Sequence, residues 1–127
     1  MSLTRDLKTH TSLDSLLIIG QTFPEPTTTA AGVRMLQLID MFTGHGYHIT
    51  FASSATSSEK SVNLDTLGVA TEQIAINDAS FDDFVRKLNP TLVLFDRFIT
   101  EEQFAWRVSQ SCPKALKILD TEDLHFL

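Results

Sequence analysis

The sequence predicts an α/β fold, in which five parallel strands form a doubly wound sheet of order 3-2-1-4-5 with helices on both faces. Short aliphatic runs, typical of strands that are covered on both faces, alternate with segments of helical periodicity. Strands and helices at this spacing form βαβ units, whose right-handed crossovers lead to a doubly wound arrangement. The length of 127 residues suits one domain. We expect residues 1–15 to be a flexible N-terminal extension and residues 16–127 to be the domain.

The first part of the chain predicts two strands with a helix between them. Residues 16–19 are an aliphatic run that ends at a glycine, as expected for a buried strand. A loop rich in proline and threonine follows, and residues 32–43 then place apolar side chains at helical spacing. Gly44 and Gly46 are suited to end that helix. Residues 48–52 alternate between apolar and polar side chains and predict the second strand.

The middle of the chain repeats the alternation. Residues 62–67 predict a weak, short helix, and residues 70–76 predict the third strand. Residues 80–88 have the clearest helical pattern in the sequence. Ser80 stands three residues before Asp83, which resembles a capping box and predicts that the helix begins there.

The last part of the chain predicts one further βαβ unit. Pro90 ends the preceding helix, because the residue before a proline avoids the α region. Residues 92–95 are a fourth aliphatic strand. Thr100 and Gln103 form a second capping-box pattern and predict a helix that begins there. Residues 115–119 complete the sheet.

Composition and charge exclude several classes of protein. The formal net charge of −6 argues against nucleic acid or an anionic membrane as the main partner. Apolar runs such as residues 16–19 are far shorter than the roughly 20 residues of a transmembrane helix. No secretory signal is visible, so we expect a cytoplasmic protein without a transmembrane segment. The single cysteine forms no internal disulfide, and no cysteine cluster exists to hold zinc or an iron–sulfur centre.

The predicted strand order indicates where a ligand would bind. Doubly wound sheets bind ligands beyond the carboxyl ends of the strands, at the point where the strand order reverses. Here that point lies between the first and fourth strands, faced by residues 21–32, 96–98 and 120–125. The expected helix N-terminus at Gly32 favours an anion or a sugar hydroxyl. Alternatively, Gly32 only permits close packing of the helix against the strand.

Acidic and basic side chains follow the fourth and fifth strands. Asp96 and Arg97 are either part of a binding site or a simple surface ion pair. After the fifth strand, six residues contain three carboxylates and one imidazole, at Asp120, Glu122, Asp123 and His125. Such a group can bind a metal, transfer protons, or lie in the first turn of a helix, where acidic residues are favourable. The residues alone leave these alternatives open.

Several segments of the chain resemble a known family. They are Leu17-Ile18-Ile19, Pro24-Glu25-Pro26 and residues 31–38, 44–51, 89–97 and 118–127. Together they resemble the N-terminal half of GT-B glycosyltransferases, and most closely the large retaining class often called group one. The last segment is the most specific, since it is similar to a D-T-x-D-L-H segment of one subset of these transferases.

The resemblance implies the acceptor-side, Rossmann-like domain of an enzyme that moves a sugar from a nucleotide-sugar donor to a sugar, lipid or protein acceptor. The C-terminal domain of this family binds the donor, and its E-x7-E signature is not found in this sequence. We therefore expect a separate donor-binding domain as partner, and an inactive chain in its absence. The resemblance also suggests a retaining mechanism that uses no metal and no cofactor, with the nucleotide-sugar donor as a substrate.

Most candidate residues of the glycosyltransferase hypothesis lie in the segments that the strand order indicates, and Arg34 lies in the helix that follows the first of them. Arg34 and Arg97 are candidates to meet phosphate or acidic acceptor groups. The catalytic residue stays unknown, with Asp96, Asp123 and His125 as candidates to orient hydroxyls. The residues expected to border the cleft are Gly32, Arg34, Arg97 and Asp120.

Two further expectations come from the residues themselves. A flavodoxin-like module for small-ligand binding or signalling is the alternative function, because three threonines follow the first strand where a flavin phosphate would sit. The first helix and residues 124–127 are also strongly apolar. They predict an exposed apolar patch or a homodimer that covers it.

Overall fold

The computed structural model describes residues 14–25, 29–57, 61 and 63–120 of the chain. Its five strands form one sheet of order β3-β2-β1-β4-β5, and every neighbouring pair is parallel. The predicted fold class and strand order are therefore confirmed. In chain order, the elements are β1 (Ser15–Gly20), α2 (Ala30–Gly44), β2 (His48–Ser53), the 3₁₀ helix η1 (Leu64–Leu67), β3 (Ala70–Gln73), α3 (Ala79–Leu88), β4 (Leu92–Asp96), α4 (Arg97–Ser111) and β5 (Leu116–Asp120).

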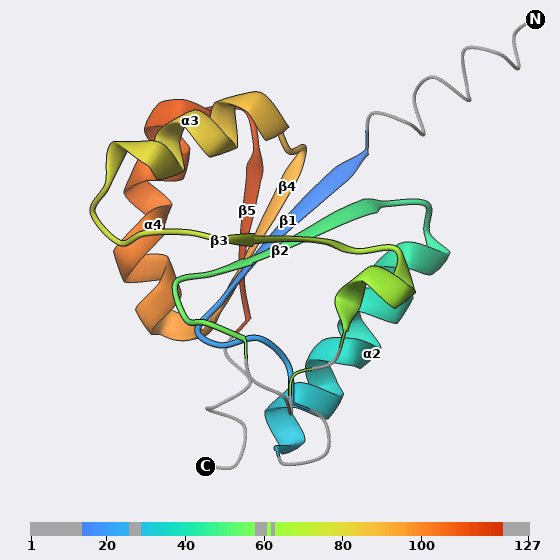
Figure 1. Cartoon of the computed structure of the whole chain (residues 1–127). Coiled ribbons are helices and arrows are strands. Elements are labelled where there is room, and N and C mark those ends of the chain that lie inside the picture. The colour runs from blue at the N-terminus through green and yellow to red at the C-terminus, as the bar shows by residue number, and fades with distance from the viewer. Residues whose placement is uncertain (1–13, 26–28, 58–60, 62, 121–127) are drawn as a thin grey trace, which may run out of the picture.

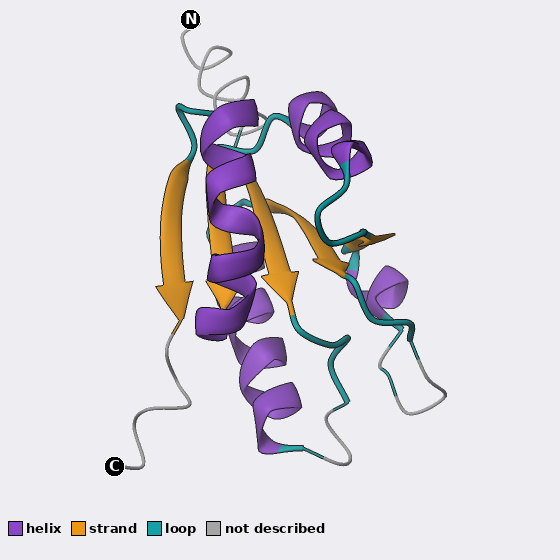
Figure 2. Ribbon diagram, turned by 90° about the vertical axis from the view of Figure 1, so that its left-hand side faces the viewer, coloured by secondary structure: helices purple, strands orange, loops and turns teal. Residues whose placement is uncertain are grey.

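Helices cover both faces of the sheet. Helix α2 lies on one face, and helices α3 and α4 lie together on the other (Figures 1 and 2). Each face has its own hydrophobic core. Met35 and Ile39 of α2 pack with alternate side chains of β1, β2 and β4, whereas Phe81 of α3 and Phe104 of α4 pack on the opposite face. The centroids of these two phenylalanine rings are 4.8 Å apart, which favours tight packing of α3 against α4.

Strand β1 lies at the centre of the sheet and explains the aliphatic run in the sequence. Residues 16–19 are completely buried, because β2 and β4 flank the strand and helices cover both of its faces. Full burial of such a side chain contributes about 1.5–3 kcal/mol. The register pairs Ile19 with Phe95 of β4. The segments after β1 and β4 therefore leave the same edge of the sheet side by side.

All three described α-helices begin earlier than the sequence predicts. Helix α2 begins at Ala30 rather than Gly32, after Thr29 as N-cap. The predicted cap of α3 at Ser80 is wrong: Asp78 is the N-cap, and its Oδ2 accepts a hydrogen bond of 3.0 Å from the backbone N–H of Ser80. A carboxylate at this position also interacts favourably with the helix dipole.

The start of α4 differs most from the prediction. The helix begins at Arg97, directly after β4 and without a loop. Thr100 is therefore no N-cap but lies within the first turn. Its buried hydroxyl donates one bifurcated hydrogen bond, to the carbonyl oxygens of Asp96 at 2.8 Å and of Arg97 at 3.1 Å. The physical reason is the backbone of Arg97, which turns sharply enough to join strand and helix.

Smaller differences concern the ends of strands and the exposed side chains. Ser15, expected in the N-terminal extension, is the first residue of β1, and β3 ends at Gln73 rather than at residue 76. Among the described residues, no helix combines the length and apolar character needed to cross a membrane. Large apolar side chains are exposed on several elements, namely Val33, Met41, Leu67, Ile76, Phe98, Ile99, Trp106 and Leu116. A homodimer that covers some of them stays a prediction.

Candidate functional site

A cavity of about 200 Å³ lies where the carboxyl ends of β1 and β4 meet the N-terminus of α2. This is the point at which the strand order reverses, and it is where doubly wound sheets bind ligands. The lining residues are Gln21, Thr22, Pro24, Thr29, Ala31, Gly32, Met35, Phe51, Asp96 and Arg97. Hollows of about 320 Å³ beside η1 and about 560 Å³ at the end of β3 are larger. Neither is lined by a cationic side chain among the described residues.

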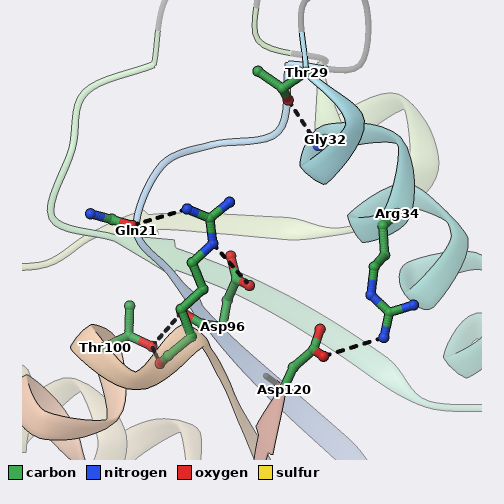
Figure 3. A network of polar contacts seen from close by, with 8 residues as sticks. Gln21, Thr29, Gly32, Arg34, Asp96, Thr100 and Asp120 are labelled. Atoms are coloured by element: carbon green, nitrogen blue, oxygen red, sulfur yellow. Dashed lines mark hydrogen bonds and ion pairs between the residues drawn. The ribbon is translucent and has the colours of Figure 1, made fainter. Parts of the chain in front are cut away.

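The N-terminus of α2 forms one wall of the cavity. Thr29 caps the helix, because its Oγ1 accepts a hydrogen bond of 2.9 Å from the backbone N–H of Gly32 (Figure 3). A Cβ atom at Gly32 would lie 2.7 Å from the carbonyl carbon of Glu25, so this glycine allows the helix to touch the loop backbone. The first turn of α2 contains no acidic side chain. The positive end of the helix dipole is therefore not compensated by a carboxylate of that turn.

Arg97 forms the opposite wall and has an unusual backbone. Its φ of +77° lies in the left-handed region, which is unfavourable for a residue with a Cβ atom. The Arg97 Nη1 atom donates a long hydrogen bond of 3.4 Å to Oε1 of Gln21. The Nε atom lies 4.0 Å from Oδ1 of Asp96 and has no hydrogen-bond partner among the described residues. Strained backbone at a cavity wall is typical of functional sites.

Asp96 and Asp120 lie next to each other at the ends of β4 and β5. The two residues are register partners in parallel strands, so their side chains point to the same face. Oδ1 of Asp120 forms an ion pair of 3.2 Å with Nη2 of Arg34 from α2 (Figure 3). This pair joins α2 to β5. Each of the neighbouring carboxylates thus faces an arginine of its own, which reduces the repulsion between them.

The structure brings together three of the residues that the sequence analysis selected. Gly32, Asp96 and Arg97 line the same cavity. Arg34 and Asp120 do not line it but pair with each other beside it. Two further candidates, Asp123 and His125, lie outside the described residues, so the acidic cluster after β5 stays a prediction.

Sequence reasoning expected residues 21–32 to face the site but singled out only Gly32 among them. Thr29 carried a usable signal, because threonine is a favoured N-cap and stands directly before the helix. The sequence signal at Gln21 is weaker, and consists only of its place as the first residue after the central strand. Met35 and Phe51 are large apolar residues of a predicted helix and a predicted strand, as core residues are. Only the tertiary structure places them in the lining of the cavity.

The lining can bind both hydrogen-bond donors and hydrogen-bond acceptors of a ligand. Of the described residues, Arg97 is the one cationic and Asp96 the one anionic side chain in it. The guanidinium donates hydrogen bonds and the carboxylate accepts them, as recognition of hydroxyl groups requires. Asp96 is also the one candidate in the lining that can accept a proton during a reaction. No group of three or more His, Cys, Asp or Glu side chains suited to hold a metal ion occurs in the described part of the chain.

Neither a protein-family model nor a curated protein matches this chain. The fold is therefore assigned from the strand order and register, and the candidate site from its geometry.

Proposed function

We propose that the chain is the acceptor-side domain of a GT-B glycosyltransferase, and that the cavity beside Arg97 holds part of the acceptor. The observation that carries the proposal is the cavity itself, which lies at the switch point and combines a guanidinium, a carboxylate and a helix N-terminus. Sugar hydroxyls donate and accept hydrogen bonds, so they need both kinds of partner in one small volume. The resemblance in sequence supports the same assignment.

The size of the cavity supports binding of the acceptor here and of the nucleotide-sugar donor by another domain. Pockets for drug-sized ligands measure about 300–1,000 Å³. A cavity of about 200 Å³ suits a single sugar ring rather than a whole nucleotide-sugar. The loop after β1 also has no G-x-G-x-x-G spacing for a pyrophosphate. The proposal therefore assigns the nucleotide-sugar to a separate donor-binding domain.

In the proposed reaction, this domain orients the acceptor and the partner domain presents the donor. Asp96 is positioned to accept a hydrogen bond from an acceptor hydroxyl, and Arg97 to hold a second acceptor group. Transition-state stabilisation is then shared between the two domains, so the chain alone is inactive. The proposal further includes a retaining outcome without a metal, and action in the cytoplasm on a sugar, lipid or protein acceptor.

The test is a titration of the purified chain, followed by calorimetry and by amide NMR spectra. We expect no binding of nucleotide-sugars, and weak binding of simple sugars that shifts the amide signals of Gln21, Gly32 and Arg97. Micromolar binding of any nucleotide-sugar would reject this assignment of the two halves. Visible flavin absorbance of the purified chain would instead favour the flavodoxin-like alternative.

A further inference from the structure

We infer that the ligand of this cavity carries an anionic group, a phosphate or a carboxylate, and that the guanidinium of Arg97 binds it. The inference rests on the proposed function only in calling that ligand an acceptor. It narrows the acceptor from any sugar, lipid or protein to one with an acidic group beside the hydroxyl that reacts.

The partners of Arg97 use little of its hydrogen-bonding capacity. A guanidinium has five N–H donors, and its hydrogen bonds to charged acceptors are typically about 2.7–2.9 Å long. The contact of Arg97 with Gln21 is 3.4 Å long and that with Asp96 is 4.0 Å. No other hydrogen bond or ion pair of its guanidinium is found among the described residues. The side chain is one-third exposed, so its remaining donors can be reached from the cavity.

The other arginine near the site is already engaged. Arg34 pairs with Asp120 at 3.2 Å and lies outside the lining of the cavity. An anion that enters the cavity therefore meets Arg97 first. Because a guanidinium is planar, it can bind two oxygens of one phosphate or carboxylate at the same time.

The backbone of Arg97 indicates that its side chain is useful at this position. A left-handed φ is unfavourable for arginine, whereas glycine would make the same turn from β4 into α4 without strain. Thr100 stabilises the turn through a bifurcated hydrogen bond to the carbonyl oxygens of Asp96 and Arg97. Strain that the surrounding structure maintains in this way favours a role in binding over a role in folding.

The charge around the cavity favours an anion, although the chain as a whole is acidic. Ala31 and Gly32, from the first turn of α2, line the cavity, and that turn has no acidic side chain. The positive end of α2 therefore acts in the same direction as the charge of Arg97. Asp96 opposes it, but its Oδ1 atom lies on the side of the Arg97 Nε atom. The Nη2 atom of Arg97 therefore stays available to a ligand, and Nη1 makes only its long hydrogen bond to Gln21.

The experiment compares three probes of similar size with the full 127-residue chain: glucose 6-phosphate, glucuronate and glucose. Binding is followed by amide NMR spectra at constant, low ionic strength, because salt screens an exposed arginine. Two variants remove the guanidinium in different ways. Arg97→Gln keeps most of the side-chain length, and Arg97→Gly keeps the left-handed backbone. Arg86→Gln is the matched control, since it removes one positive charge from an exposed pair on α3.

We expect at least one anionic probe to bind about tenfold or more tightly than glucose, as charge-assisted hydrogen bonds imply. Both Arg97 variants should lose that preference, and Arg86→Gln should keep it. The phosphate and carboxylate arms then show which anion the site prefers. Equal affinity for all three probes, no binding of any, or a preference that survives in a folded Arg97 variant would overturn the inference. Binding of nucleotide-sugars contradicts only the proposed function, so the two failures are distinguishable.

Discussion

Replacing Arg97 by glycine should give a more stable protein than replacing it by alanine. Inside a helix an alanine variant is usually more stable than a glycine variant, because glycine is less favourable there by about 0.8–1.0 kcal/mol. Arg97 is the first residue of α4, but its φ is +77°. Both substitutions remove the same guanidinium and its contacts, so their difference reports the backbone alone.

The magnitude of this difference follows from two opposing effects. The left-handed conformation costs a residue with a Cβ atom about 1–2 kcal/mol, and glycine avoids this cost. Glycine loses more conformational freedom on folding, which offsets about 0.5–1 kcal/mol of the gain. The net advantage of glycine over alanine at position 97 is therefore about 0.5–1 kcal/mol. For a domain of this length, that corresponds to a melting temperature about 2–5 °C higher.

Urea denaturation at equilibrium, with the slope held as a check on two-state unfolding, measures the free energy of unfolding of each variant. The matched control is Glu102, an exposed residue inside the same helix. At that position, the alanine variant should be more stable than the glycine variant by about 1 kcal/mol. The order of the two substitutions should thus reverse between positions 97 and 102. The same order at both positions would refute the left-handed turn, and with it the argument that Arg97 is strained.

Three further predictions concern two glycines of α2, an ion pair between α3 and α4, and the N-cap of α3. Gly32→Ala should lower the free energy of unfolding by about 1–3 kcal/mol, because its Cβ atom would lie 2.7 Å from a backbone atom. Gly44→Ala, which meets open space, should instead raise it by about 0.4–1 kcal/mol. Arg107→Ala breaks a mostly buried ion pair of 2.8 Å between α3 and α4, so it should cost about 1–3 kcal/mol in the same denaturation assay. Arg86→Ala breaks an exposed pair and should cost less than about 0.5 kcal/mol; equal losses would contradict the burial argument. Hydrogen bonds from the side chain and the backbone N–H of Ser80 hold the pKa of Asp78 below its ordinary value of 3.8. The contribution of the ionised Asp78 to the free energy of unfolding is fully present at a pH above that ordinary value. It is lost as the pH falls through the lower pKa of the folded state. Asp78→Asn should therefore weaken the pH dependence of stability in acid, and an unchanged acid profile would contradict this role.

The sequence by itself determined the class of fold and the strand order. Residues 16–19 and 92–95 are aliphatic on both faces, which only strands covered on both sides require. Helix periodicity between the strands and the right-handed crossover then leave few possible sheet orders. The ends of helices were also readable, since Gly44 is the last residue of α2 and the residue before Pro90 caps α3. These signals are local, because each depends on a residue type and its near neighbours.

Only the tertiary structure decided where α4 begins and which residues form the cavity. Arginine has no preference for the left-handed region, so nothing in the sequence marks Arg97 as a turn residue. The turn exists because β4 and α4 are both held by packing, and the first residue of α4 adopts the backbone that joins them. Arg34 and Asp120 are likewise 86 positions apart and meet only after β5 pairs with β4. Contacts of this kind depend on how completed elements pack together, and local residue preferences carry no record of that packing.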